Sequence, residues 1–141
     1  MVGITKEMVG MRNLTLILTT LIFSVMFSSS TSFAGWKKVI TNENGTTYVD
    51  FERIKKHGGY VYFWFLNDWL KPNKYGDLSQ KGYTQGDCKI FRYKGLSGSG
   101  YKGPMGGGTV VFNNKLDKEW KYPQPDSPPE TILKSVCQYA R

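Results

Sequence analysis

The C-terminal segment Asp126–Arg141 constrains the fold most strongly, because it encodes a short amphipathic helix that carries a cysteine. Ser127 and Glu130 form an S-x-x-E capping box, and Pro128 stands at the first helical position, where a missing N–H is tolerated. Apolar residues then recur at helical spacing on one face: Ile132, Leu133, Val136, Cys137 and Ala140. A helix this short is unstable alone in water, so it must lie on another apolar surface.

The N-terminus has the three-part layout of a secretory signal peptide. Lys6 and Arg12 precede an apolar run at residues 14–27, and the small residues Ser32 and Ala34 occupy the positions that a signal peptidase reads. We expect cleavage after Ala34. The signal peptide is then residues 1–34, and the mature domain is residues 35–141.

An uncleaved membrane anchor is the alternative interpretation, but an apolar run of about 14 residues is short for a span of roughly 20. Translation can start at Met1, Met8 or Met11, because all three precede the run. No cysteine follows the run directly, so we expect no lipid attachment at the new N-terminus. Cleavage would remove the apolar run, so we expect no membrane span in the mature chain.

The mature domain is small and basic. Its length suits one domain with a single core. Removal of Lys6, Glu7 and Arg12 takes away two positive charges and one negative charge, so the formal net charge falls from +8 to +7. Such a surface favours acidic partners, namely polyanionic glycans, phospholipid headgroups, nucleic acid or acidic proteins, although many exported proteins are simply basic.

The chain contains two cysteines, Cys88 and Cys137. Two cysteines in an exported protein are expected to pair. Closing a loop of about 49 residues would stabilise the domain by about 4 kcal/mol in the chain-entropy model. The sequence therefore predicts a C-terminal helix tied by a disulfide to a β-sheet.

Several strands followed by one helix indicate an α+β domain with an antiparallel sheet. We predict a hairpin turn at Asn44-Gly45, one helical turn at residues 52–56, a glycine-rich connection at 98–108, and a linker at 113–125 anchored by Trp120 and Tyr122. A return to strand is expected after Ser79. The other predicted strands are residues 35–41, 46–51, 60–66, 87–96 (which carries Cys88) and 109–112.

The strongest strand pattern is Tyr60–Leu66, which is rich in aromatic and β-branched residues. Val61, Phe63 and Phe65 point to one face; the other face holds Tyr60, Tyr62, Trp64 and Leu66. Both faces are apolar or amphipathic, so a central strand covered on both sides is predicted. The helix can cover only one side, which leaves a subunit partner, a ligand or a long loop for the other.

The face that holds Tyr60, Tyr62 and Trp64 has three interpretations. It can be core beneath the helix, a dimer face, or a stacking platform for single-stranded nucleic acid, since lysines lie nearby. Export argues against nucleic acid, and we expect no nucleic-acid partner.

No catalytic, metal or cofactor site is expected. His57 is the only histidine of the chain, and it stands in a K-K-H-G-G turn without the serine and carboxylate of a triad. Gly98–Gly103 matches G-x-G-x-x-G, but Pro104 and a predicted strand follow it instead of a helix. A small secreted hydrolase that uses His57 is the enzymatic alternative.

In their order along the chain, several short motifs resemble the surface-adhesin protein E family. The resemblance covers nearly all of the mature chain. Its residues are Gly45–Asp50, Ile54-Lys55-Lys56 with Gly58, Trp64, Asp87-Cys88, Arg92, Gly103–Gly108, Trp120, Ser127 and Cys137.

The resemblance implies a sheet of about six antiparallel strands with the C-terminal helix on its concave face, held by the disulfide. It also implies an ability to form homodimers and to bind host extracellular-matrix proteins. Adhesive binding in the family is attributed to a basic stretch around the first half-cystine. In this chain, that stretch offers Lys81, Lys89, Arg92 and Lys94 as candidate partner-binding residues.

The sequence therefore favours a non-enzymatic, exported, adhesin-like binding protein whose partner is a matrix protein or an acidic glycan. Family adhesins of this type carry a lipid anchor, and we expect none here. A periplasmic or envelope interaction module that never reaches the cell surface is the alternative.

Overall fold

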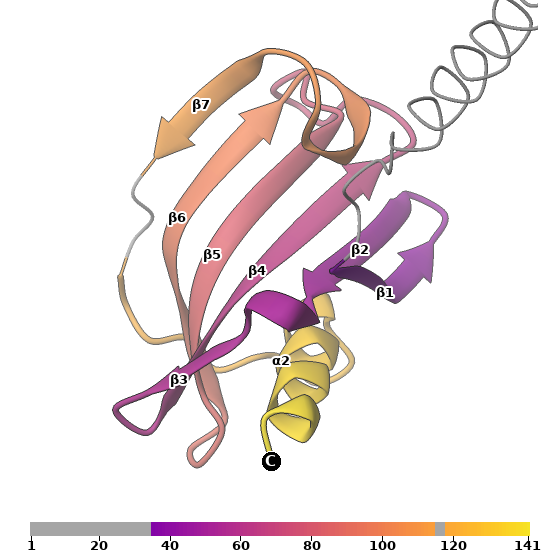
Figure 1. The fold of residues 1–141 in the computed structure, drawn as a ribbon. Helices are drawn as coiled ribbons and strands as arrows, with labels where there is room; N and C mark the ends of the chain where they lie inside the picture. Colours follow the sequence, from indigo (N-terminus) through magenta and orange to yellow (C-terminus); the bar gives the residue numbers. More distant parts are fainter. Residues whose placement is uncertain (1–34, 115–117) are drawn as a thin grey trace, which may run out of the picture. The chain divides into compact units, whose positions relative to one another are not determined.

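The computed structural model describes residues 35–114 and 118–141, which form an antiparallel sheet and one α-helix (Figure 1). The predicted signal peptide and its cleavage site lie outside the described residues. Within the described part of the chain, no helix is long and apolar enough to cross a membrane. The elements are β1 (Trp36–Asn42), β2 (Gly45–Asp50), η1 (Phe51–Arg53), β3 (Lys55–His57), β4 (Tyr60–Trp69), β5 (Ser79–Asp87), β6 (Arg92–Tyr101), η2 (Pro104–Gly106), β7 (Val110–Asn114) and α2 (Pro128–Tyr139).

The strands follow the order β1-β2-β4-β5-β6-β7, and every pair is antiparallel. The short strand β3 pairs with the start of β4. It lies on the same edge of β4 as β2, which pairs with the C-terminal half of that strand. The described sheet thus has seven strands, that is, the expected six and the additional β3. The predicted α+β class and antiparallel sheet are confirmed.

The helical turn predicted at residues 52–56 is present, but it begins one residue earlier and ends at Arg53. A 3-10 turn occupies Phe51–Arg53, where Asp50 Oδ1 accepts a hydrogen bond from the Arg53 N–H at 3.2 Å. The chain then enters β3 at Lys55, because β4 offers an unpaired edge there. Long-range pairing therefore decides the conformation of a segment whose local pattern favours a helical turn.

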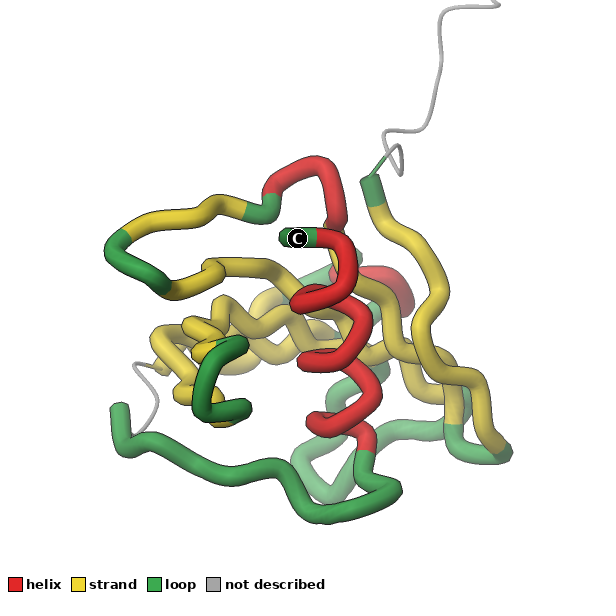
Figure 2. Tube along the Cα trace, turned by 90° about the horizontal axis from the view of Figure 1, so that it is seen from below, coloured by secondary structure: helices red, strands yellow, loops and turns green. Residues whose placement is uncertain are grey.

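Helix α2 begins as predicted. Ser127 Oγ accepts a hydrogen bond from the Glu130 N–H at 3.4 Å, and Glu130 Oε2 accepts one from the Asp126 N–H at 2.8 Å. The buried helical residues pack against the face of β4 that presents Val61 and Phe63; they are Ile132, Leu133 and Val136. Figure 2 shows α2 lying against the sheet.

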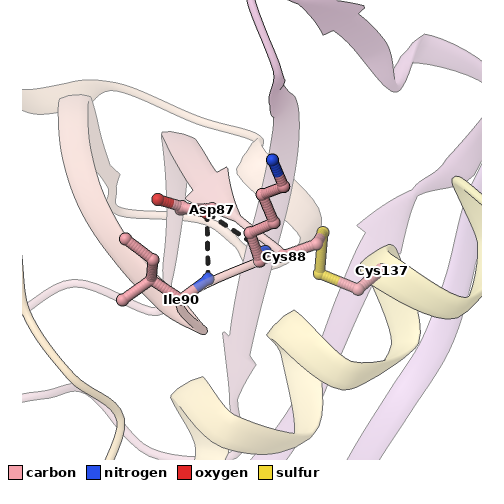
Figure 3. The surroundings of a disulfide bond; sticks show 5 residues. Asp87, Cys88, Ile90 and Cys137 are labelled. Carbon is pink, nitrogen blue, oxygen red and sulfur yellow. Dashed lines mark hydrogen bonds between the residues drawn. A yellow bond between two sulfur atoms is a disulfide. The ribbon is translucent and has the colours of Figure 1, made fainter.

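A disulfide joins Cys88 to Cys137, with a Cα–Cα distance of 5.7 Å, and this confirms the predicted pairing (Figure 3). The prediction that a strand at 87–96 carries Cys88 is wrong. Strand β5 ends at Asp87, and residues 88–91 form a turn in which Asp87 Oδ1 accepts hydrogen bonds from the N–H groups of Lys89 and Ile90 at 3.1 and 3.2 Å. Figure 3 shows both bonds.

Strand β6 extends to Tyr101, so the glycine-rich connection predicted at 98–108 begins only after that residue. A glycine pair between β5 and β6 permits close packing in the sheet. Gly98 pairs with Gly82, and a Cβ atom at Gly82 would overlap the ring of Phe65. Glycine therefore lets the aromatic ring of Phe65 lie directly on the neighbouring strand.

Replacing both cysteines with serine (C88S/C137S) is expected to lower the free energy of unfolding by about 4 kcal/mol, because the disulfide closes a loop of 49 residues. Urea titration of the oxidised wild type and the variant measures the difference. Wild-type protein titrated in reductant is the control, and it should match the variant. A change below about 1 kcal/mol would show that α2 is held by packing alone.

Candidate binding surface

The face of the sheet opposite α2 gathers aromatic and basic side chains. Side chains alternate along a strand, so Tyr62 and Trp64 point away from the face that Val61 and Phe63 share with the helix. Strand pairing continues this opposite face onto β5 and β6. We call it the helix-free face, and its members include Tyr60, Tyr62, Trp64, Leu66, Lys81, Tyr83, Gln85, Asp87, Arg92 and Lys94. The tyrosines and tryptophan of β4 are therefore not core beneath the helix.

A row of aromatic rings crosses the helix-free face. The Trp64 and Tyr83 rings are stacked with centroids 4.8 Å apart, and the Tyr62 and Tyr83 centroids are 6.3 Å apart. All three rings are half-buried. Rings that are packed against one another on one side and reached by solvent on the other form a platform on which a flat or apolar group can lie.

Trp120 closes one end of this face. Lys121 exchanges two backbone hydrogen bonds with Tyr93 of β6, at 2.9 and 2.8 Å, and so places the segment along the edge of that strand. The Trp120 ring then lies 5.4 Å from the Tyr60 ring. Trp120 anchors the linker as predicted. Tyr122 is 61% exposed, but its side chain interacts with the Arg92 guanidinium.

Two cations lie over the Trp120 ring. The Arg92 guanidinium is 4.3 Å from the ring centroid and the Lys94 Nζ is 4.6 Å from it. Arg92 Nε also donates to Asp87 Oδ2 at 3.1 Å. Arg92 is thus positioned by both a ring and a carboxylate, and Lys94 lies beside it over the same ring.

The carboxylate of Asp87 organises this end of the sheet. Burial by itself raises the pKa of Asp87, but the Ile90 N–H, the Arg92 guanidinium and the Lys89 N–H together outweigh burial and hold the pKa below its ordinary value of 3.8. The same carboxylate therefore caps the turn that carries Cys88 and positions a cation on the helix-free face.

Three of the four predicted binding residues share the helix-free face. Arg92 and Lys94 lie at the Trp120 end. Lys81 lies at the η2 end of β5, where its side chain lies against Gly106 and its Nζ is 5.3 Å from the Tyr101 ring centroid. Lys89 is exposed in the β5–β6 turn and lies outside the face. The structure brings Lys81, Arg92 and Lys94 to one surface and leaves Lys89 at the end of the sheet.

The glycine-rich loop around η2 covers the other end of the face. The Met105 N–H donates to Asp68 Oδ1 at 2.7 Å, and the Gly106 N–H donates to Ser79 Oγ at 2.8 Å. Leu66, which shares this face, is only 1% exposed where η2 packs against β4. A long loop, one of the three covers considered from the sequence, therefore accounts for part of the second side of β4.

Neither of the two motifs weighed for enzymatic chemistry shows a matching site. His57 is exposed on β3. The G-x-G-x-x-G segment begins inside β6 and leads into η2, so it does not open a helix that could hold a pyrophosphate. Among the described residues, no three histidine, cysteine or carboxylate side chains gather as a metal site would require.

Together, these features define a class of single-sheet α+β domain with one disulfide-tethered helix. A profile of the family described as surface-adhesin protein E matches residues 36–138, and the chain belongs to that family. Membership makes it an adhesin-like protein of the exported or surface class. A comparison with curated proteins found no match.

Solved structures of Haemophilus influenzae protein E share the fold. Crystal form II is similar with a TM-score of 0.60 at 19% identity, over 77% of this chain and 91% of that chain. A second structure gives 0.60 at 18% identity, over 74% and 85% of the two chains. A structure from the non-typeable bacterium gives 0.55 at 17%, over 77% and 79%.

The substitution Asp87→Asn is expected to make stability less sensitive to acid. The lowered pKa means that ionised Asp87 contributes its full stabilisation above its ordinary value of 3.8, and that this contribution is lost as the pH falls through the lowered value. The amide keeps an oxygen for the turn N–H groups but loses the charge that Arg92 neutralises. Urea titrations at a series of acidic pH values should show a shallower fall for the variant than for wild type. Parallel curves would contradict the role assigned to Asp87.

Proposed function

We propose that the mature protein is a non-enzymatic exported binding protein whose helix-free face binds acidic glycan chains of the extracellular matrix. One observation carries the proposal: Lys81, Arg92 and Lys94 lie on the same face as a row of stacked rings. Sulfate and carboxylate groups of a glycan would pair with the cations. The apolar faces of its sugar rings would lie on Trp64 and Tyr62.

The spacing of the cations favours a chain over a single anion. Lys94 is paired with Gln85, and Lys81 stands four residues from Gln85 along β5. At about 3.3 Å per residue, the two lysines are roughly 13 Å apart along the strand direction. An extended polyanion can reach both lysines at once, whereas one phosphate cannot.

A second candidate partner is an acidic surface of a host matrix protein, and membership of an adhesin family favours it. Homodimers are also proposed on the same ground. A competition experiment separates these partners from a glycan. An excess of soluble sulfated glycan should abolish binding to an immobilised glycan. It should not abolish binding to a protein that contacts the domain outside the basic residues.

The variant K81Q/K94Q is expected to weaken binding to immobilised heparin by about tenfold, because two charge contacts of up to about 1 kcal/mol each are lost. The matched control is K37Q/K56Q, which removes the same charge from exposed lysines paired with Val49 and Val61, on the helix side of the sheet. Affinity is measured by biosensor titration at physiological salt. An equal loss in both variants would show that net charge alone controls binding.

We also propose that export removes residues 1–34. When the full chain is produced with its own leader, the exported protein is expected to begin Gly35-Trp36, as read by N-terminal sequencing. Cell fractionation then separates an envelope module, confined to the periplasm, from a protein that reaches the outside. A full-length chain that stays in the membrane fraction would contradict cleavage.

A further inference from the structure

The loop between β4 and β5 presents to solvent large apolar side chains that are not part of the core cluster. Leu70 is 74% exposed and Tyr75 is 64% exposed. Trp69 is half-buried at the base of the loop, and it lines a hollow of about 550 Å³ together with Leu70 and Pro72. We call Leu70, Lys71, Pro72, Lys74 and Tyr75 the β4–β5 tip. Neighbouring apolar side chains that are exposed together on one loop and rimmed by polar residues are typical of an interaction site.

The backbone beneath the tip is fixed by hydrogen bonds. Asn73 Oδ1 accepts from the N–H groups of Tyr75 and Asp77, at 2.9 and 3.0 Å, and the Asn73 N–H donates to the Asp77 carbonyl at 2.9 Å. The Leu70 N–H donates to the Asn44 carbonyl in the neighbouring β1–β2 turn, also at 2.9 Å. The apolar side chains are therefore held outward in advance, and binding through them costs little further ordering.

Cations surround the apolar side chains of the tip. Lys71 is exposed, and Lys74 lies with its Nζ 4.9 Å from the Tyr75 ring centroid. Lys102 Nζ donates to the carbonyls of Tyr75 and Gly76 at 3.4 and 3.2 Å, beneath the loop. Two acidic residues share this end: Glu43 of the β1–β2 turn lines the hollow, and Asp77 is fully buried within the loop. Lys71, Lys74 and Lys102 outnumber them, and Asp77 does not reach the surface that the lysines present.

We propose that the β4–β5 tip docks on an anionic phospholipid bilayer. Leucine inserts among acyl chains, tyrosine and tryptophan prefer the headgroup level, and lysine reaches lipid phosphates while its stem lies along apolar surface. A stable protein interface buries about 800 Å² on each partner, which two exposed apolar side chains on a loop do not supply. The tip is separate from the helix-free face, so this inference does not depend on the proposed glycan binding.

The test is co-sedimentation of the mature domain with vesicles of phosphatidylcholine alone or of phosphatidylcholine mixed with phosphatidylglycerol. Binding is expected to the mixed vesicles and to be much weaker to phosphatidylcholine. K71Q/K74Q should weaken it by about fivefold per lysine, because each cation near an anionic surface is worth about 1 kcal/mol. L70A/Y75A should weaken it by about tenfold or more through lost insertion.

The matched control is I90A/Y122A. It removes one aliphatic and one tyrosine side chain whose exposure is similar to that of Leu70 and Tyr75. Both residues lie outside the tip, and Ile90 lies in the β5–β6 turn at the other end of β5. This variant should bind vesicles like the wild type, and circular dichroism confirms that all variants fold. Absence of binding to mixed vesicles would overturn the proposal. So would equal binding by L70A/Y75A and wild type, since contact would then be through charge alone. Tip-dependent capture of a protein without vesicle binding would assign the tip to a protein partner and also overturn it.

Discussion

The tether between α2 and the β5–β6 turn determines which side of the sheet becomes the core. Cys88 holds the helix at one end of β5, and Leu133 and Val136 lie against the Val61 side of β4. One helix forms a single layer, so only one face of the sheet can be dry. The other face must therefore be stable while partly in contact with water, and this requirement explains the kind of side chains found there.

Strand β4 meets that requirement through its alternating side chains. Its helix side carries purely apolar groups such as Phe63, which is 1% exposed. Its other side carries Tyr62 and Trp64, whose rings stack with Tyr83 while a hydroxyl or indole N–H remains available to polar partners. Short covers close the two ends of this side, Trp120 at one and the η2 loop at the other. The open middle presents the stacked rings, with Lys94 at the Trp120 end and Lys81 at the η2 end.

Local sequence signals predicted the helix, its cap, the disulfide and the two faces of β4. The β5–β6 turn escaped prediction because Cys88–Phe91 contains no glycine, proline or asparagine, and the turn depends on the Asp87 carboxylate. That turn also sets the register that places Lys94 opposite Gln85. A slip of one residue would turn Lys94 to the helix side, so the shared face of the predicted basic residues could not be read from the sequence alone.

The way the cations are held explains why this face, more than the overall charge, suits an acidic partner. A salt bridge positions a cation but neutralises its field, as Asp87 does in part for Arg92. An aromatic ring positions a cation and leaves its charge in place, as Trp120 does for both Arg92 and Lys94. The Trp120 end of the face thus keeps positive charge at fixed positions beside flat rings. A basic side chain that moves in solvent contributes to net charge but must be ordered before it can bind.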